Sequence, residues 1–258
     1  MGPSGFGALL REWRTRRRAS QLDLALGAGV SARHVSFLET GRARPSRAMV
    51  LRLAAELDVP LAARDGWLLA AGLAPAYAPR DPDEAEGRMA WGAVTWMVDR
   101  HDPYPALALD RRWRVMRANA AAGRLLGGVG VGDGDSLLEA FLAPGPLRDA
   151  IANAGEVAAH LRARLAAEDR HYGGDPVLGG AVARLDAMWG SSDAHGAAEP
   201  AGAFLPVRYR VGSAELSLFS TVAQFQTAQD IALSELRVEL MFPADDASRA
   251  MLLAATAA

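Results

Sequence analysis

Two of the twenty amino-acid types, cysteine and lysine, do not occur in this chain of 258 residues. The absence of cysteine excludes disulfides, zinc sites with thiolate ligands and thiol nucleophiles, and it fits a reducing cytoplasm. The absence of lysine excludes the phosphate-binding loop that ends in lysine, and it excludes Schiff-base chemistry. All 28 basic residues are therefore arginine, whose guanidinium group binds phosphates and guanine edges through paired hydrogen bonds.

Long apolar runs are also missing. No stretch of 18 consecutive apolar residues occurs, and the chain does not start with the charged and then apolar segments of an export signal. We therefore expect a cytoplasmic protein with no membrane partner.

The charge of the chain is unevenly distributed along it. Residues 1–80 carry 12 arginines against 6 acidic residues, a net charge of +6, whereas the remainder carries 16 against 24, a net charge of −8. This difference in charge predicts that the basic segment binds a polyanion and that the acidic segment does not.

The hydrophobic pattern predicts two domains. Residues 1–74 read as wholly helical, with five helices that begin near residues 6, 20, 31, 46 and 61. The proline-rich segment 75–84 is the expected linker. Residues 85–258 mix helices and strands, so the predicted fold class is an all-α domain followed by an α+β domain. The expected elements of the second domain are helices near 85–100, 119–127, 146–168 and 176–189, and strands near 105–110, 112–119, 205–211, 214–226 and 235–242.

Residues 20–39 predict a helix-turn-helix. Two short helices, each begun by a serine, are joined by a tight turn at Gly29 and Val30. In this arrangement the second helix enters the major groove of DNA. Val35 and Leu38 would anchor that helix, and its opposite face would contact bases. The candidate readers on that face are Ala32, Arg33, Ser36 and Phe37, with His34 at the edge.

The first domain resembles the phage-repressor, or XRE, type of five-helix DNA-binding domain. The matching residues are Arg14, Ser20-Gln21, Leu24-Ala25, Ala28-Gly29-Val30-Ser31, Phe37-Leu38-Glu39, Gly41, Pro45-Ser46 and Leu53-Ala54. The resemblance implies a phosphate contact for Gln21 and a buried ion pair between Arg14 and Glu39. It also implies backbone contacts from Arg42, Arg44 and Ser46, and we add Ser31, which begins the reading helix. Gly27 departs from the pattern and predicts a short second helix.

The second domain resembles PAS domains, and the whole chain resembles the MmyB-like transcription regulators. The resemblance is carried by residues 101–119, HDPYPALALDRRWRVMRAN, and by residues 216–245. It implies a five-stranded antiparallel sheet around a pocket for a small, fatty-acid-like or otherwise apolar effector. The candidate pocket residues are Trp113, Met116, Arg117, Asn119, Phe204, Arg208, Tyr209, Phe219, Phe225 and Met241. For each of the apolar and aromatic ones taken singly, a place in a plain core is the favoured alternative. Among the candidates, Asn119 is also a possible helix cap, and Arg117, Arg208 and Tyr209 are candidates for binding a carboxylate.

Catalytic patterns are weak throughout. The glycine-rich segment 127–135 follows a helix, so the strand-to-helix context of a phosphate loop is missing. Ser191, Asp193 and His195 are too close in sequence for a triad, and Glu156 with His160 lacks a third metal ligand. We expect no enzyme, metal site or cofactor. The sequence favours a homodimeric regulator of a double-stranded DNA operator, and the alternative is a protein-interaction module whose second domain is a scaffold.

Overall fold

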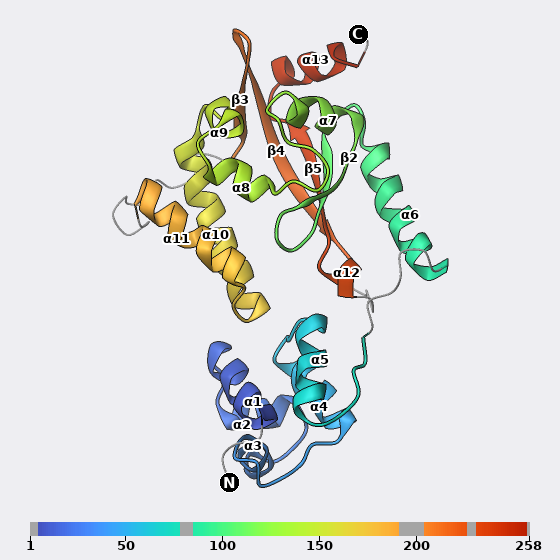
Figure 1. Ribbon diagram of the computed structural model, residues 1–258, viewed down its shortest axis with the longest axis vertical. Coiled ribbons are helices and arrows are strands. Elements are labelled where there is room, and N and C mark those ends of the chain that lie inside the picture. Colours follow the sequence, from blue (N-terminus) through green and yellow to red (C-terminus); the bar gives the residue numbers. More distant parts are fainter. Residues whose placement is uncertain (1–4, 78–84, 191–203, 226–230, 257–258) are drawn as a thin grey trace. The chain divides into compact units, whose positions relative to one another are not determined.

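The computed structural model describes residues 5–77, 85–190, 204–225 and 231–256 (Figure 1). Most of the predicted linker and most of the Ser-Asp-His segment at 190–196 lie outside these residues. The chain divides into two compact units, one formed chiefly by residues 1–79 and the other chiefly by residues 80–258. We call them the head and the body and describe each by itself.

The head contains the five helices that the sequence predicts. Its core is apolar and includes Phe6, Trp13, Leu24, Val35 and Leu53, all at most 5% exposed. The helices are α1 (Gly5–Arg16), α2 (Gln21–Gly27), α3 (Ala32–Glu39), α4 (Arg47–Glu56) and α5 (Leu61–Ala70).

Serine side chains begin the helices of the helix-turn-helix. The Ser20 hydroxyl accepts a hydrogen bond from the Asp23 backbone N–H at 3.0 Å, and the Asp23 carboxylate accepts one from the Ser20 N–H at 2.8 Å. Helix α2 ends at Gly27 after only seven residues. The turn then passes through Gly29, whose positive φ of 62° suits glycine, and the four residues between Gly27 and Ala32 connect α2 to α3.

The body is built on a five-stranded antiparallel sheet with the strand order β2-β1-β5-β4-β3. This confirms the predicted fold class, a helical domain followed by an α+β, PAS-like domain. The longest strand, β4, lies between β5 and β3, so the long apolar segment after Gly212 is an interior strand. The strands are β1 (Ala106–Leu109), β2 (Val115–Ala118), β3 (Val207–Val211), β4 (Ala214–Gln224) and β5 (Arg237–Pro243).

Helices cover both sides of this sheet (Figure 1). Helix α6 (Ala85–Arg100) packs against β1, β2 and β5 through Val94 and Val98, which are fully buried. Helices α8 to α11 lie on the other side, where they leave room for the pocket described below. The remaining helices of the body are α7 (Ala120–Gly127), α8 (Leu137–Leu142), α9 (Pro146–Ala150), α10 (Ala154–Tyr172), α11 (Pro176–Trp189), α12 (Ile231–Ser234) and α13 (Asp246–Ala254).

The prediction of one helix over 146–168 is wrong, because residues 151–153 leave the helical path to pair with the edge of β3. Ile151 forms an antiparallel bridge with Tyr209, and the Ala152 N–H donates to the Arg208 carbonyl at 2.7 Å. The Asn153 side chain donates to the Pro206 carbonyl at 2.9 Å. These bonds satisfy the edge strand, which would otherwise expose unpaired backbone groups.

Helices α8, α12 and α13 were not predicted. Their apolar segments are short, and α8 and α13 depend on caps at Ser136 and Asp245 more than on a long periodic stripe. The expected alternation of buried and exposed side chains along β3 also ends before the last residue of the strand. Val211 is 44% exposed because it lies at the β3–β4 hairpin, beyond the cover of the helices.

A buried serine attaches α13 to the sheet, and its removal should destabilise the body. The Ser248 hydroxyl is fully buried and accepts a hydrogen bond from the Ser217 N–H of β4 at 2.9 Å. Ser248→Ala leaves that N–H buried without a partner, which should lower the unfolding free energy of the body by about 1–3 kcal/mol. Urea unfolding of the full chain checks this. Ser213→Ala, at an exposed hairpin position, is the matched control, and an equal effect of both would contradict the assignment.

Candidate functional site

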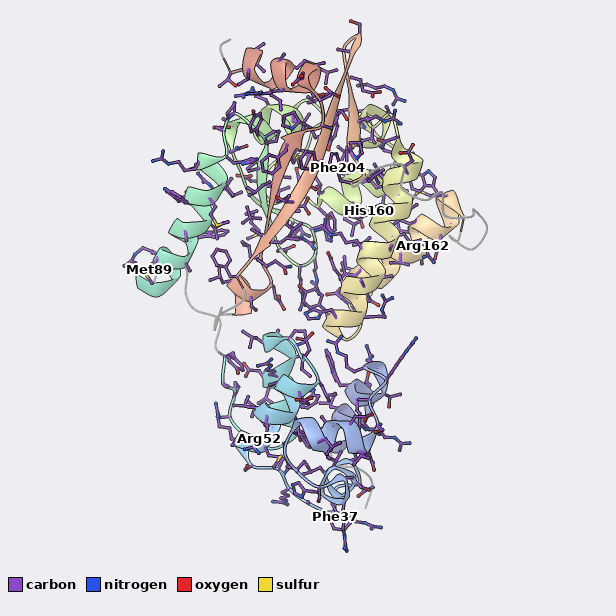
Figure 2. All side chains as sticks on the ribbon, turned by 180° about the vertical axis from the view of Figure 1, so that it is seen from behind. Phe37, Arg52, Met89, His160, Arg162 and Phe204 are labelled. Atoms are coloured by element: carbon purple, nitrogen blue, oxygen red, sulfur yellow. The ribbon has the colours of Figure 1, made fainter. Side chains whose placement is uncertain are left out.

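Helix α3 divides its side chains between the core of the head and its surface. Val35 and Leu38 are fully buried, whereas Arg33 is exposed and Ser36 and Phe37 are half-buried. Figure 2 shows Phe37 at the outer surface of the head. The predicted split between anchoring and outward residues is therefore present in the fold.

Phe37 lies between two arginines. The Arg33 guanidinium carbon is 5.2 Å from the centre of the Phe37 ring, and that of Arg42 is 6.0 Å from it. Such contacts between a cation and an aromatic face orient the side chains while leaving their N–H donors available. Within the described residues, neither arginine forms an ion pair, and neither does Arg44. The outer face of α3 and the segment after it therefore present uncompensated positive charge.

The other predicted contact residues border this face. Ser31 and Ser46 are exposed and cap α3 and α4, since their hydroxyls accept from the backbone N–H groups of His34 and Met49 at 3.1 and 3.3 Å. Each hydroxyl keeps its own hydrogen for a phosphate oxygen. Ala32 and His34 are half-buried at the edge of the same surface.

Glu39 joins the first three helices from inside the head. Its carboxylate accepts from Arg14 Nε at 2.6 Å and Arg14 Nη2 at 3.1 Å, and from Gln21 Nε2 at 2.7 Å. The Arg14 and Glu39 side chains are 14% and 4% exposed. One hydrogen of the Gln21 amide is thus used within the protein, and the second is left for a phosphate.

The loss of the Glu39 side chain should lower the unfolding free energy of the head much more than the loss of an exposed glutamate that also pairs with an arginine. Glu39→Ala leaves Arg14 largely buried without its counter-charge, so we expect a loss of about 3 kcal/mol or more in the unfolding free energy of the head. The control is Glu12→Ala, which breaks an exposed pair with Arg16 on the same helix α1 and should cost less than about 1 kcal/mol. Thermal unfolding followed by circular dichroism measures both, and similar losses would contradict the role of Glu39.

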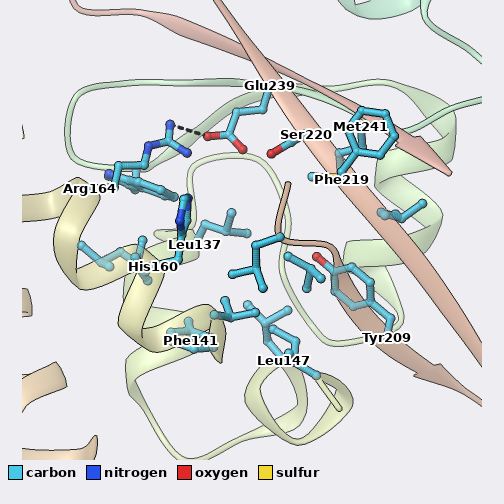
Figure 3. A pocket seen from close by; sticks show the side chains of 18 of the residues that line it. Leu137, Phe141, Leu147, His160, Arg164, Tyr209, Phe219, Ser220, Glu239 and Met241 are labelled. Carbon is cyan, nitrogen blue, oxygen red and sulfur yellow. Dashed lines mark hydrogen bonds and ion pairs between the residues drawn. The ribbon is translucent and has the colours of Figure 1, made fainter. Parts of the chain in front are cut away.

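The body contains a pocket of about 390 Å³ between the sheet and helices α8 to α10 (Figure 3). Its volume falls in the range of small-molecule sites, about 300–1,000 Å³. Five residues predicted as candidates line it: Trp113, Phe204, Tyr209, Phe219 and Met241. The residues that sequence reasoning did not assign to it include Leu138, Phe141, Leu147, His160, Arg164, Ser220 and Glu239.

One wall of the pocket is polar. Arg164 Nη2 of α10 donates to Glu239 Oε1 of β5 at 2.7 Å, and the Glu239 side chain is 7% exposed. The Trp113 ring lies beside both Arg164 and Arg237, whose guanidinium carbons are 4.5 and 4.2 Å from its centre. Trp113 has a positive φ of 64°, a conformation rarely adopted by large side chains and held here by the β1–β2 turn. The ring is therefore fixed in place.

Three predicted ligand residues on β2 and at its end lie away from the pocket. Met116 is 43% exposed. Arg117 pairs with Asp99 of α6 at 2.7 Å, because alternate residues of β2 face α6. Asn119 is buried and fully engaged as the cap of α7: its oxygen accepts from Ala106 N–H and Ala122 N–H, and its amide donates to the Tyr104 carbonyl. The alternative of a structural cap is the correct one for Asn119.

Arg208 and Phe225 are also not pocket residues. Arg208 neighbours Tyr209 on β3, so its side chain points to the opposite face, where it lies 3.5 Å from Glu156 and 3.9 Å from Glu215. Phe225 packs against the buried cluster under α6, on the other side of the sheet from the pocket.

The missed pocket residues come from elements far apart in the sequence. Of the missed residues, Glu239 is the one that the sequence could best have identified. Apolar and polar residues alternate over 235–242, which places Glu239 on the same face of the strand as Arg237 and Met241. A buried carboxylate on that face requires a partner, but its partner Arg164 stands 75 residues earlier on α10. His160, which the sequence suggests only as an incomplete metal site with Glu156, is exposed and also lines the pocket.

The surroundings of Tyr209 in the pocket change its pKa, and this change predicts how the stability of the protein depends on pH. Burial, with a smaller contribution from the charge of Glu239, raises the pKa of Tyr209 from 10.0 to about 12. Between these values the unfolded chain loses this proton and the folded chain keeps it. The unfolding free energy should therefore fall as the pH rises from 10 to about 12.

Phenolate absorbance measures this titration directly. The wild type should show one late component near pH 12 that Tyr209→Phe removes. The control is Tyr77→Phe, in the head, which should keep the late component. Titration curves of the wild type and Tyr209→Phe that share the same late component would contradict the assignment.

Two further findings concern the part of the chain that the structure describes. In it, no three histidine, aspartate or glutamate side chains come together in a way that could hold a metal ion. Among the described helices, none combines the length and the apolar composition needed to cross a membrane.

The geometry defines a helix-turn-helix protein whose second helix of the motif presents Arg33 and Phe37 at its surface, joined to an α+β domain with a largely apolar pocket. A family model described as helix-turn-helix matches residues 10–63, and one described as the MmyB-like transcription regulator ligand binding domain matches residues 92–254. The second match covers more than half of the chain, so the chain belongs to the MmyB-like transcription regulators. It is a DNA-binding transcription regulator with a ligand-binding domain. None of the curated proteins compared with it matches.

Proposed function

We propose that the protein binds a specific operator as a homodimer, with helix α3 in the major groove, and acts in the cytoplasm. The observation that carries this proposal is the pair of arginines, Arg33 and Arg42, held on either side of Phe37 on an exposed face without acidic partners among the described residues. Arg33 is the candidate for a bidentate contact with guanine, and Phe37 for packing on a thymine methyl group. One such helix covers too few base pairs for specificity in a genome, which is why two heads are required.

The body is the proposed sensor of a small, apolar effector. Most of the residues that line its pocket are aliphatic or aromatic, as expected for a site that holds a chain such as that of a fatty acid. Occupancy would regulate DNA binding only if the effector has different affinities for two arrangements of the dimer. The direction of regulation depends on which arrangement has the heads one helical turn apart.

A protein-interaction module is the second candidate. Leu22 and Leu26, one turn apart on α2, are 57% and 72% exposed in the head, and an exposed leucine pair is suited to a protein partner. The salt dependence of DNA binding separates the two functions. Phosphate contacts give an affinity that falls steeply with salt, whereas a head that only binds protein gives no defined complex with DNA.

The test of base reading uses an operator selected from a random double-stranded pool. Arg33→Ala should weaken binding to that operator by about 1–3 kcal/mol and leave binding to random DNA nearly unchanged. Gln21→Ala should weaken both, because phosphates carry no sequence information. The control is Arg249→Ala on α13, which removes an exposed arginine of the body. Fluorescence anisotropy at fixed salt measures the affinities, and equal losses for Arg33→Ala on both DNAs would exclude it as a base reader.

A further inference from the structure

Five polar side chains line the otherwise apolar pocket, and they determine what the polar end of an effector meets. His160 and Arg164 come from α10, and Tyr209, Ser220 and Glu239 come from β3, β4 and β5. Glu239 and Ser220 lie on the same face of neighbouring strands, because Glu239 pairs with Val222 and Ser220 pairs with Met241. Figure 3 shows the Glu239 carboxylate and the Tyr209 hydroxyl both directed into the pocket.

The arginine that lines the pocket already has a carboxylate partner within the protein. Arg164 donates to Glu239 at 2.7 Å and lies against the Trp113 ring. A ligand carboxylate that bound Arg164 in place of Glu239 would leave Glu239 buried without its counter-charge, which is strongly unfavourable. A carboxylate placed elsewhere in the pocket would be repelled by Glu239, whose charge is screened less than that of an exposed carboxylate because its side chain is buried. The charge of Glu239 already acts at the Tyr209 hydroxyl, where it helps to keep the phenol protonated.

The remaining hydrogen-bonding capacity matches a neutral group that both donates and accepts. Within the described residues, Glu239 Oε2 and the hydroxyls of Tyr209 and Ser220 form no hydrogen bond with the protein. Glu239 can only accept, so a group that reaches it must donate. The hydroxyls of Tyr209 and Ser220 can donate to the same group. An alcohol meets both requirements, and a carboxylate fails the first.

We infer that the pocket selects an apolar chain that ends in a hydroxyl group over the carboxylic acid of the same length. This inference rests on the proposed sensing function and names the chemical class of its effector. A volume of 390 Å³ holds roughly thirteen groups of the size of a water, at about 30 Å³ each. A chain of about ten carbons with one hydroxyl fits that space.

The test compares decan-1-ol with decanoate on the full chain at pH 7.5, after lipids carried over from purification have been removed. Isothermal titration calorimetry should give a dissociation constant for decan-1-ol at least tenfold lower than that for decanoate. Glu239→Gln should abolish or reverse this preference, because it removes the negative charge and releases Arg164 to pair with decanoate. The matched control, Glu215→Gln, changes an exposed glutamate of β4 outside the pocket and should keep the preference.

Ser220→Ala keeps the inference testable if Glu239→Gln does not fold. It should weaken decan-1-ol binding severalfold and leave decanoate binding unchanged, since only the alcohol is expected to bond there. Equal or tighter binding of decanoate by the wild type would overturn the inference and leave ligand sensing intact. Binding of neither compound would overturn both the inference and the proposed sensing of an apolar chain, while the DNA-binding proposal would be judged separately on the operator.

Discussion

The buried carboxylate of Glu39 is the interaction on which the head depends most. It stands at the last turn of α3 and accepts hydrogen bonds from Arg14 of α1 and Gln21 of α2, so one group fixes three helices to each other. The arrangement matters for the proposed base reading because Arg33 and Phe37 lie on the same helix as Glu39. A helix that must place a guanidinium within hydrogen-bonding distance of a base edge needs a fixed position relative to the helix that contacts the backbone. The ion pair supplies that position from inside the protein.

Glu239 has a comparable place in the body, but its surroundings give it a different consequence. It also is a buried carboxylate paired with an arginine, yet one of its oxygens faces a cavity instead of a packed core. The pair therefore acts on whatever enters the pocket as well as on the fold. In the proposed sensor, the apolar lining holds a hydrocarbon chain, and the paired charges select the polar end that the chain carries.

The sequence predicted the head almost completely and the body only in outline. Helices of the head are short, amphipathic and begun by serines, so each is determined by neighbours in the sequence. The strands of the body could also be located, because alternation is local. The break at 151–153 could not, because an otherwise helical segment is interrupted by pairing with β3, more than 50 residues later. The same reason explains the wrong pocket residues on the strands: Arg117 and Arg208 have suitable chemistry, but the strand register turns them away from the pocket.

In the proposed complex, two copies of this chain place helix α3 in successive major grooves. A hydroxyl-radical footprint of the purified full chain on its selected operator tests it most directly. We expect two protected half-sites with centres about 34 Å apart, one turn of the DNA helix, related by an approximate inverted repeat. A single protected half-site, or no protection at salt concentrations where random DNA is released, would contradict it.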